Sequence, residues 1–319
     1  MKRTLIVAAA LASLGASAFA QSTVTVYGRL NVSVESQKVG NGKTDWVMQN
    51  NASRWGLKGS EDLGGGMKAG FQLESGFNAA TGAISPYVGG STAFWARQSE
   101  VNLSGGFGMV RLGNYTSEAY YATSDYVGMH NHETGTSSDA FYAYLGRATS
   151  KVAYRTPSFS GATFEAGVTA GGNQERTYDY ALNYDAGPLH LGAGYEDNSP
   201  TNKNAKQFAV RGLYEMGAFT FGGYIQRDTD GYGTGFGDRT TYRLSGMYAI
   251  GATELHLNYG HAGDYSKLAG DQKANQYTVA VNQNLSKRTK VYAFYTKIDD
   301  KGTIYGDFSS FAVGVRHNF

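Results

Sequence analysis

The chain has 319 residues, among them 24 Tyr, 16 Phe and 44 Gly but only 4 Pro and no Cys. This composition favours strands over helices, and the lack of Cys excludes a fold that depends on disulfides. The 28 basic and 26 acidic residues give a formal net charge of +2, so overall charge predicts no polyanionic partner such as nucleic acid.

The N-terminal segment has the features of a signal peptide. Lys2 and Arg3 precede an apolar run, residues 5–14, and a small-residue cleavage site, Ala18-Phe19-Ala20. We therefore expect residues 1–20 to be removed, which leaves equal numbers of basic and acidic residues in the mature chain. The apolar run is shorter than the ~20 residues that a transmembrane helix needs.

The first mature segment, residues 23–35, predicts an amphipathic strand. Apolar and polar side chains alternate along it with a period of two, which gives one apolar face. The same pattern returns in residues 311–318, before the terminal Phe319. The first and last strands can therefore pair and close a sheet.

Between these two segments, alternation bounded by Gly, Asn, Asp and Ser clusters predicts fourteen more strands. Their centres are Trp55, Phe71, Val101, Val110, Tyr154, Phe164, Leu182, Leu191, Val210, Phe221, Leu244, Leu255, Val279 and Tyr292. The total is sixteen, and single-chain bacterial barrels have an even number of antiparallel strands. We expect residues 21–319 to form one barrel without a second domain.

The connections between the predicted strands alternate between short and long. The short ones, at residues 63–66, 104–108, 160–161, 187–188, 216–217, 250–251 and 286–288, suit periplasmic turns, and the longer polar ones suit extracellular loops. The longest runs from about Tyr115 to Tyr144 and follows the fifth strand. It is too long for an ordinary hairpin, so we expect it to be a functional loop.

The polar face of the predicted strands carries many charges. It includes Arg29, Asn31, Ser33, Glu35, Arg54, Lys58, Gln72, Glu74, Arg111, Lys151 and Arg155. A packed core cannot hold so many charges, because each unpaired one is costly to bury, whereas a water-filled lumen can. A single closed sheet with its apolar face outward needs lipid, and sixteen strands leave an aqueous channel. The sequence therefore predicts an all-β, sixteen-stranded antiparallel transmembrane barrel.

Several motifs resemble those of the general diffusion porins of beta-proteobacteria, and the resemblance spans the whole chain. They are residues 22–28, residues 53–66, Arg97-Gln98, residues 110–113, residues 154–157 and residues 313–319. The resemblance implies a homotrimer in the outer membrane of a Gram-negative bacterium, with the third extracellular loop, here residues 115–144, folded into the lumen. It also implies passive diffusion of small hydrophilic solutes and inorganic anions, with no catalysis and no cofactor.

The same resemblance implies further partners. An outer-membrane barrel contacts outer-membrane lipid and lipopolysaccharide. Barrels of this kind commonly end in Phe, preceded by alternating apolar residues that the insertion machinery recognises. Phe319 is therefore the expected insertion signal of this chain.

The resemblance also implies which residues control the pore. Anion-preferring members carry an arginine ladder on the barrel wall, and the matching positions here are Arg54, Arg97 and Arg155. Strand parity directs Arg54 and Arg155 inward. Arg97 shares the phase of the apolar Val101, and it points inward only if the chain is irregular before Ser99.

The long loop supplies the acidic residues that would face such a ladder. The constriction candidates are Glu118 and Asp125, with Glu133 and Asp139 also available, and the other lumen-facing charges are Arg29, Lys58, Glu74, Arg111 and Lys151. Arginines opposite carboxylates would set a field across the pore and make it favour anions. The alternative is that the arginines are merely solvated, or pair with nearby acids such as Glu74.

Two further motifs have simple explanations. His130-Asn131-His132-Glu133 suggests a metal site, but no third ligand is identifiable and a polar loop explains it. The glycine-rich residues 231–237 resemble a phosphate-binding loop, but no helix follows them. The histidines do not reveal a base beside a strand nucleophile, so no catalytic residue is predicted.

The main alternative function is a substrate-specific porin. The long loop is unusually aromatic, since it contains Tyr115, Tyr120, Tyr121, Tyr126, Phe141, Tyr142 and Tyr144. These rings could form a binding track for a sugar or an organic acid. We prefer the interpretation that some of these rings anchor the loop to the wall and others lie in the interfacial girdle.

Overall fold

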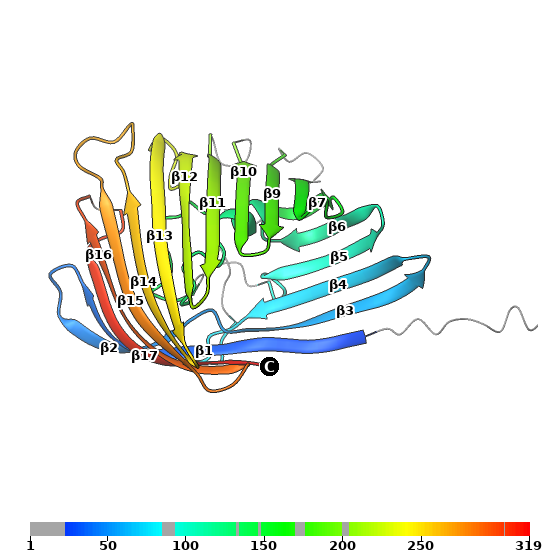
Figure 1. Ribbon diagram of the computed structural model, residues 1–319. Coiled ribbons are helices and arrows are strands. Elements are labelled where there is room, and N and C mark those ends of the chain that lie inside the picture. Colours follow the sequence, from blue (N-terminus) through cyan, green and yellow to red (C-terminus); the bar gives the residue numbers. More distant parts are fainter. Residues whose placement is uncertain are drawn as a thin grey trace, which may run out of the picture.

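The computed structural model describes residues 23–84, 93–131, 134–145, 148–169, 176–199, 204–302 and 304–319. These residues form one antiparallel sheet that closes on itself, because the first strand also pairs with the last (Figure 1). The predicted signal peptide lies outside the described residues, as do His132 and Glu133.

The sheet contains seventeen strands, and a short helix lies in the longest connection. The bounds are β1 (Thr23–Val39), β2 (Thr44–Asn50), β3 (Arg54–Gly64), β4 (Met67–Gly76), β5 (Gln98–Gly105), β6 (Gly108–Tyr115), α2 (Glu118–Thr123), β7 (Ala148–Arg155), β8 (Ala162–Thr169), β9 (Tyr178–Ala186), β10 (Leu189–Asp197), β11 (Lys206–Met216), β12 (Phe219–Thr229), β13 (Asp238–Ile250), β14 (Thr253–Ala262), β15 (Ala274–Asn284), β16 (Thr289–Asp300) and β17 (Phe308–Asn318). Each of the sixteen predicted segments coincides with one of these strands.

The seventeenth strand arises because one wall strand is interrupted. Both β2 and β3 pair with β1, β2 with its second half and β3 with its first half. The break falls at Asn51–Ser53, where Ala52 has a positive φ of 55°. The wall is therefore a closed ring of sixteen strands, as the sequence predicts, and β2 was missed because the break separates it from the segment centred on Trp55.

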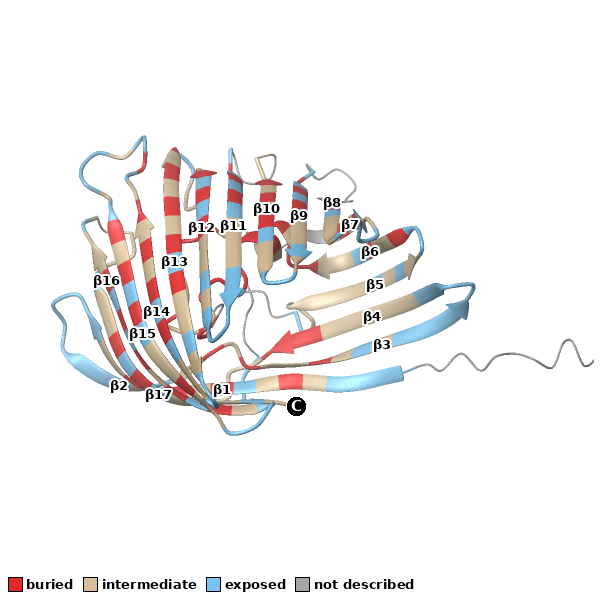
Figure 2. Cartoon of the chain, viewed as in Figure 1, coloured by how far each residue is buried: buried red, intermediate tan, exposed pale blue. Residues whose placement is uncertain are grey.

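The two faces of the wall differ as the alternation predicts. Along β1, Val24 and Leu30 on the outer face are 66% and 42% exposed, whereas Asn31, Ser33 and Glu35 on the other face are at most 1% exposed. Figure 2 shows the same alternation of buried and more exposed positions along several of the strands. The apolar side chains face outward and the polar ones inward, which is the reverse of a protein whose wall faces water.

The short connections lie where the sequence predicts them. Those from β3 to β4 and from β9 to β10 turn through Gly64 and Gly187, whose φ values are 78° and 57°. Glycine is the residue that adopts this left-handed backbone without steric cost. All seven short turns lie at the same end of the barrel, because successive strands run in opposite directions, and this end is called the short-turn end below.

The longest connection, residues 116–131 and 134–145 between β6 and β7, is called the inner segment here. It begins with the one-turn helix α2, whose N-cap Ser117 accepts a hydrogen bond from the backbone N–H of Tyr120. Within the described residues, no helix is long and apolar enough to cross a membrane. Helix α2 packs against β9, β10 and β11.

The rest of the inner segment contacts the polar face of strands on other sides of the ring. Asn31 of β1 donates to Asn131 over 3.2 Å, Gln226 of β12 accepts from the backbone N–H of Ala143 over 2.7 Å, and the backbone carbonyl of His130 accepts from a lysine of β16. These strands lie on different sides of a closed ring, so a single segment can contact all of them only from inside the ring. The inner segment therefore lies against the inside of the wall.

Candidate functional site

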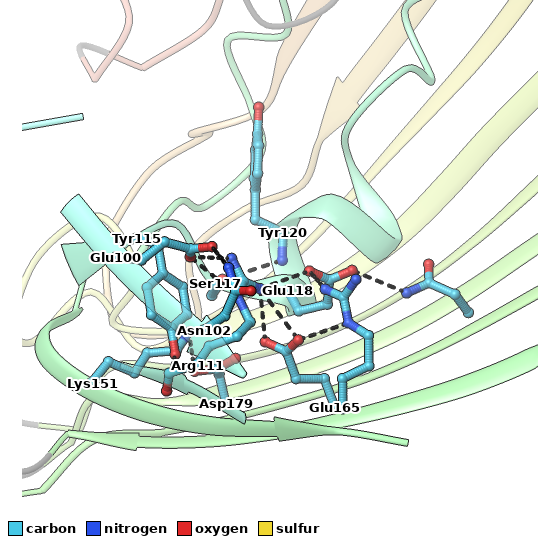
Figure 3. Close-up of polar contacts among 12 residues, drawn as sticks. Glu100, Asn102, Arg111, Tyr115, Ser117, Glu118, Tyr120, Lys151, Glu165 and Asp179 are labelled. Carbon is cyan, nitrogen blue, oxygen red and sulfur yellow. Dashed lines mark hydrogen bonds and ion pairs between the residues drawn. The ribbon is translucent and has the colours of Figure 1, made fainter. Parts of the chain in front are cut away.

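The first group of charges on the inner wall is a cluster of two arginines and three carboxylates (Figure 3). Arg111 of β6 contacts Glu100 at 2.7 Å, Glu165 at 3.3 Å and Glu118 of α2 at 3.6 Å. Arg155, at the end of β7, pairs with Glu165 at 2.8 Å and with Glu118. These five residues, the arginine–carboxylate cluster, connect α2 to the wall by charge-assisted hydrogen bonds.

A lysine extends this group on its other side. Lys151 of β7 is 1% exposed and pairs with Asp179 of β9 at 2.7 Å. The ring of Tyr115 lies between the two cations, with the Arg111 guanidinium 4.1 Å and the Lys151 ammonium 4.5 Å from its centroid. The charges on this side of the lumen are thus paired with one another and with an aromatic face.

A different arrangement lies on the neighbouring part of the ring, beyond β4. Arg54 of β3 lies directly across from Arg29 of β1, and Arg316 of β17 lies directly across from Lys290 of β16. Arg316 is also the partner of Asn31, two positions along β1 from Arg29. Four cations on four neighbouring strands therefore form a continuous band, which is called the basic row.

Arg97 and Lys58 lie beside the basic row. Arg97 bonds Glu74 at 2.6 Å, and Glu74 also accepts a hydrogen bond from the Tyr27 hydroxyl over 3.0 Å. The Lys58 ammonium lies 5.3 Å from the Tyr27 ring centroid. Arg97 reaches the inner face because it precedes Gln98, where β5 begins, so that strand parity does not direct it outward.

Two acidic residues of the inner segment, Asp139 and Asp125, lie beside further arginines of the wall. Asp139 lies 3.4 Å from Arg243 of β13 and also accepts a hydrogen bond from Tyr224. Asp125 is 8% exposed and lies within electrostatic range of Arg211, whose guanidinium donates to the Asp125 backbone carbonyl over 3.1 Å. Asp139 and Asp125 thus lie beside arginines of β13 and β11.

The predicted constriction residues are thus divided among separate groups. Arg54 lies in the basic row, Arg97 pairs with Glu74, and Arg155 joins Glu118 in the arginine–carboxylate cluster. Asp125 lies beside Arg211. From the predicted set, the structure pairs Arg155 with Glu118.

Sequence reasoning missed two members of the basic row, Arg316 and Lys290. Arg316 shows the polar phase of the last strand, so its inward direction was readable from the alternation. Its position beside Arg29 could not be predicted from the alternation. That position depends on the register between β1 and β17, whose paired residues lie almost 290 positions apart in the sequence. The register is set by the whole closed sheet.

Most of the aromatic residues of the inner segment pack against other rings. Tyr142 is 7% exposed and contacts Val127 and Tyr224, while Tyr120 packs edge-on against Tyr142 and Tyr144 at 5.7 and 5.1 Å between centroids. These contacts anchor the segment to β11 and β12, since buried edge-to-face pairs contribute beyond their buried area. Tyr126 differs, because its side chain is 59% exposed.

The candidate metal ligand His130 lies in a polar contact with the wall. Its Nδ1 lies 2.9 Å from the side-chain oxygen of Asn282, and its ring packs 5.5 Å from that of His256. Burial lowers the pKa of His130 to about 3, so the ring is neutral at physiological pH. Among the residues that the structure describes, no group of three His, Cys, Asp or Glu side chains could hold a metal ion.

Comparison with known proteins assigns this architecture to a family. The chain matches the Gram-negative porin family over residues 7–303. It belongs to that family. It is 31% identical to outer membrane porin protein 32 of Delftia acidovorans, over 92% of this chain and 88% of the relative. It is 27% identical to an outer membrane porin protein of Bordetella pertussis, over the full length of both.

Solved structures support the same fold. The anion-selective porin from Comamonas acidovorans superimposes with a TM-score of 0.71 at 24% identity, and the alignment covers 94% of this chain and all of that one. OmpF of Salmonella typhi, solved with daunomycin, gives a TM-score of 0.74 at 15% identity over 93% and 97% of the two chains. The protein is therefore a channel of the Gram-negative outer membrane for passive diffusion of small hydrophilic solutes, and the family predicted from the motifs is confirmed.

Replacing Gly192 by valine should lower the conductance of single channels. Gly192 of β10 faces α2, and a Cβ at this position would overlap the backbone carbonyl oxygen of Ala122. Valine therefore forces α2 away from the wall and toward the lumen, where it obstructs ion flow. Conductance steps in planar lipid bilayers measure the effect.

Gly212→Val is the matched control. Gly212 lies on the neighbouring strand β11 but on the outer face, and the nearest atom to an added Cβ is a methyl carbon of Leu191 at 3.8 Å. This variant should conduct like the unmodified protein. Equal conductance of Gly192→Val and Gly212→Val would contradict the assigned position of α2.

Proposed function

We propose that this porin is a trimeric, anion-preferring general diffusion channel that is narrowed by the inner segment. The observation that carries the proposal is the basic row, Arg54, Arg29, Arg316 and Lys290, on four adjacent wall strands. An anion passing along the row gains Coulomb energy of about 1 kcal/mol per unit charge at 4 Å, even in water. A cation loses the same amount.

The distribution of acids supports the sign of the preference. Glu118 pairs with Arg155 and Arg111, and Asp139 lies against Arg243, so these carboxylates pair with cations outside the basic row. The mature net charge is zero if residues 1–20 are removed, since Lys2 and Arg3 account for the excess of 28 basic over 26 acidic residues. Selectivity then follows from where the charges lie and not from their total.

Substituting both Arg29 and Arg54 by glutamine should lower the anion-to-cation permeability ratio several-fold. Glutamine keeps the polarity and much of the length of the side chain, but two of the four charges of the basic row are lost. The reversal potential of the channel in a KCl gradient measures the ratio directly, because it depends on the relative permeability of the two ions.

Arg155→Gln is a control that removes one lumenal charge outside the basic row. Arg155 is held by Glu118 and Glu165, so its loss leaves a local surplus of negative charge without removing a member of the row. The ratio should change less than in the double variant. An unchanged reversal potential in the Arg29 and Arg54 variant would rule out the basic row as the origin of selectivity.

Assembly and export follow the same proposal. Among the structural neighbours is an outer membrane protein of Vibrio cholerae described in a trimer form, with a TM-score of 0.69 at 14% identity. We infer a homotrimer here, exported with residues 1–20 as a cleaved signal peptide. Outer-membrane lipid, lipopolysaccharide and the barrel-insertion machinery are its expected partners, and Phe319 is the expected insertion signal.

A further inference from the structure

A cavity lies between the inner segment and the short-turn end of the barrel. Its volume is about 490 Å³, within the range of small-molecule sites. Tyr126 and Met129 of the inner segment contribute to it from one side, and residues close to the short turns line the rest. None of these residues belongs to the arginine–carboxylate cluster.

Three cations converge on this cavity. Lys290 and Arg316 come from the basic row, and Arg211 comes from β11. Nε of Arg316 and Nε of Arg211 are buried and have no hydrogen-bond partner among the described residues. Each is a charged donor, so an acceptor carried by an anionic ligand would satisfy it.

Two carboxylates and a histidine also line the cavity, and they do not cancel this charge. Glu254 accepts hydrogen bonds from Asn282 over 3.0 Å and Asn284 over 2.7 Å. The side chain of Glu215 is 61% exposed and lies 4.0 Å from His190. Three cations thus line the cavity with two carboxylates, of which one is held by side-chain amides and the other is solvated, while Asp125 lies beside Arg211 behind the lining.

The remaining lining is apolar. Met129, Leu213 and Met247 contribute to the same cavity, and the exposed ring of Tyr126 adds an aromatic face. Methionine adapts its shape to different apolar ligands. Tyr126 and Met129 both have positive φ, 64° and 52°, and strain of this kind in residues other than glycine concentrates at functional sites.

We propose that this cavity binds small organic anions that carry one carboxylate on an apolar, preferably aromatic, body. The carboxylate would lie between Arg316, Lys290 and Arg211, and the apolar body would lie against Met129, Leu213 and Met247. The site deepens the proposed function, since it draws on the same basic row. An inorganic anion engages only the charged half, so the apolar half distinguishes organic acids from chloride.

The test uses the purified trimer in planar bilayers, with 3-phenylpropanoate as the probe. Millimolar 3-phenylpropanoate should reduce the KCl current of single channels, more strongly from the short-turn side. Acetate, which lacks the apolar body, and 3-phenylpropan-1-ol, which lacks the charge, should block at least tenfold more weakly. Equal block by 3-phenylpropanoate and acetate would overturn the proposal.

Two variants locate the block. Met247→Ser and Arg316→Gln should each raise the half-blocking concentration of 3-phenylpropanoate about tenfold, which corresponds to about 1.4 kcal/mol. Met216→Ser and Arg288→Gln are the matched controls, because Met216 is 54% exposed at the end of β11 and Arg288 lies in an exposed short turn. KCl conductance steps verify that every variant forms channels. Block that is unchanged in Met247→Ser places the probe elsewhere and refutes the site.

The reversal potential of the unmodified channel separates this inference from the proposed function. Anion preference in KCl without block by 3-phenylpropanoate refutes the cavity site and leaves the proposed function intact. Block that depends on Met247 and Arg316 in a channel without anion preference supports the site and contradicts the proposed selectivity.

Discussion

Substituting Arg111 by methionine is expected to destabilise the folded barrel by about 3–5 kcal/mol, the usual cost of removing one partner from a buried ion-pair network. Arg111 is 7% exposed and contacts three carboxylates. Methionine fills much of the volume but removes the Arg111 partner of Glu100, while Glu118 and Glu165 keep their contacts with Arg155. Urea titration of the protein refolded into lipid vesicles measures the free energy of unfolding.

An exposed arginine supplies the control for this variant. The side chain of Arg227 is 61% exposed and pairs with Asp238 at 2.9 Å, so Arg227→Met should change stability by at most about 1 kcal/mol. Combining Arg111→Met with Glu100→Gln should recover part of the loss, because one of the uncompensated charges is then removed. If Arg111→Met is as stable as Arg227→Met, the cluster does not hold the wall together.

The strands were predictable because their signal is local. Alternation with a period of two is visible in a window of about eight residues, and it survives whatever the neighbouring strands contain. The sequence did not predict β2, because the break that separates it from β3 depends on contacts that are distant in the sequence. The break at Asn51–Ser53 is stabilised by distant partners, since Asn51 donates to Ser33 over 2.8 Å and to Tyr292 over 2.9 Å, and a local pattern does not encode such contacts.

The candidate site was predictable only in part, for the same reason. Parity shows that Arg111 and Lys151 point inward, and both do. It does not show that Arg111 meets Glu165, because the two residues lie on β6 and β8 and come together across β7. Local sequence reasoning therefore gives the direction of a lumenal side chain but not its partner, which depends on the register of the whole sheet.

The lumenal arginines fall into two groups. On the side of α2 they pair with carboxylates, which is the structural interpretation. Along β3, β1, β17 and β16 the cations lie beside one another, and our proposal of anion selectivity rests on this arrangement. The inner segment connects the regions, because α2 binds the first and Tyr126 and Met129 face Arg316 and Lys290 in the cavity.

Deleting Phe319 is expected to prevent the accumulation of folded protein in the outer membrane. Phe319 closes the barrel, because its backbone N–H donates to the carbonyl of Gly28 and its carbonyl accepts from the Gly28 N–H, both over 3.1 Å. Its ring lies over Gly28, where an added Cβ would overlap it. Cell fractionation, with the gel mobility of unheated samples as the measure of folding, should find the truncated chain in the periplasm.

Phe319→Ala separates the two roles that the deletion removes together. Alanine keeps both backbone hydrogen bonds with Gly28 but lacks the ring. If the insertion machinery recognises the ring, Phe319→Ala should remain in the periplasm like the deletion, yet refold into lipid vesicles, where no machinery acts. If Phe319 serves only to close the sheet, Phe319→Ala should reach the outer membrane normally. Phe319→Tyr preserves the ring and the backbone contacts, so it should insert in either case, and its failure would contradict both roles.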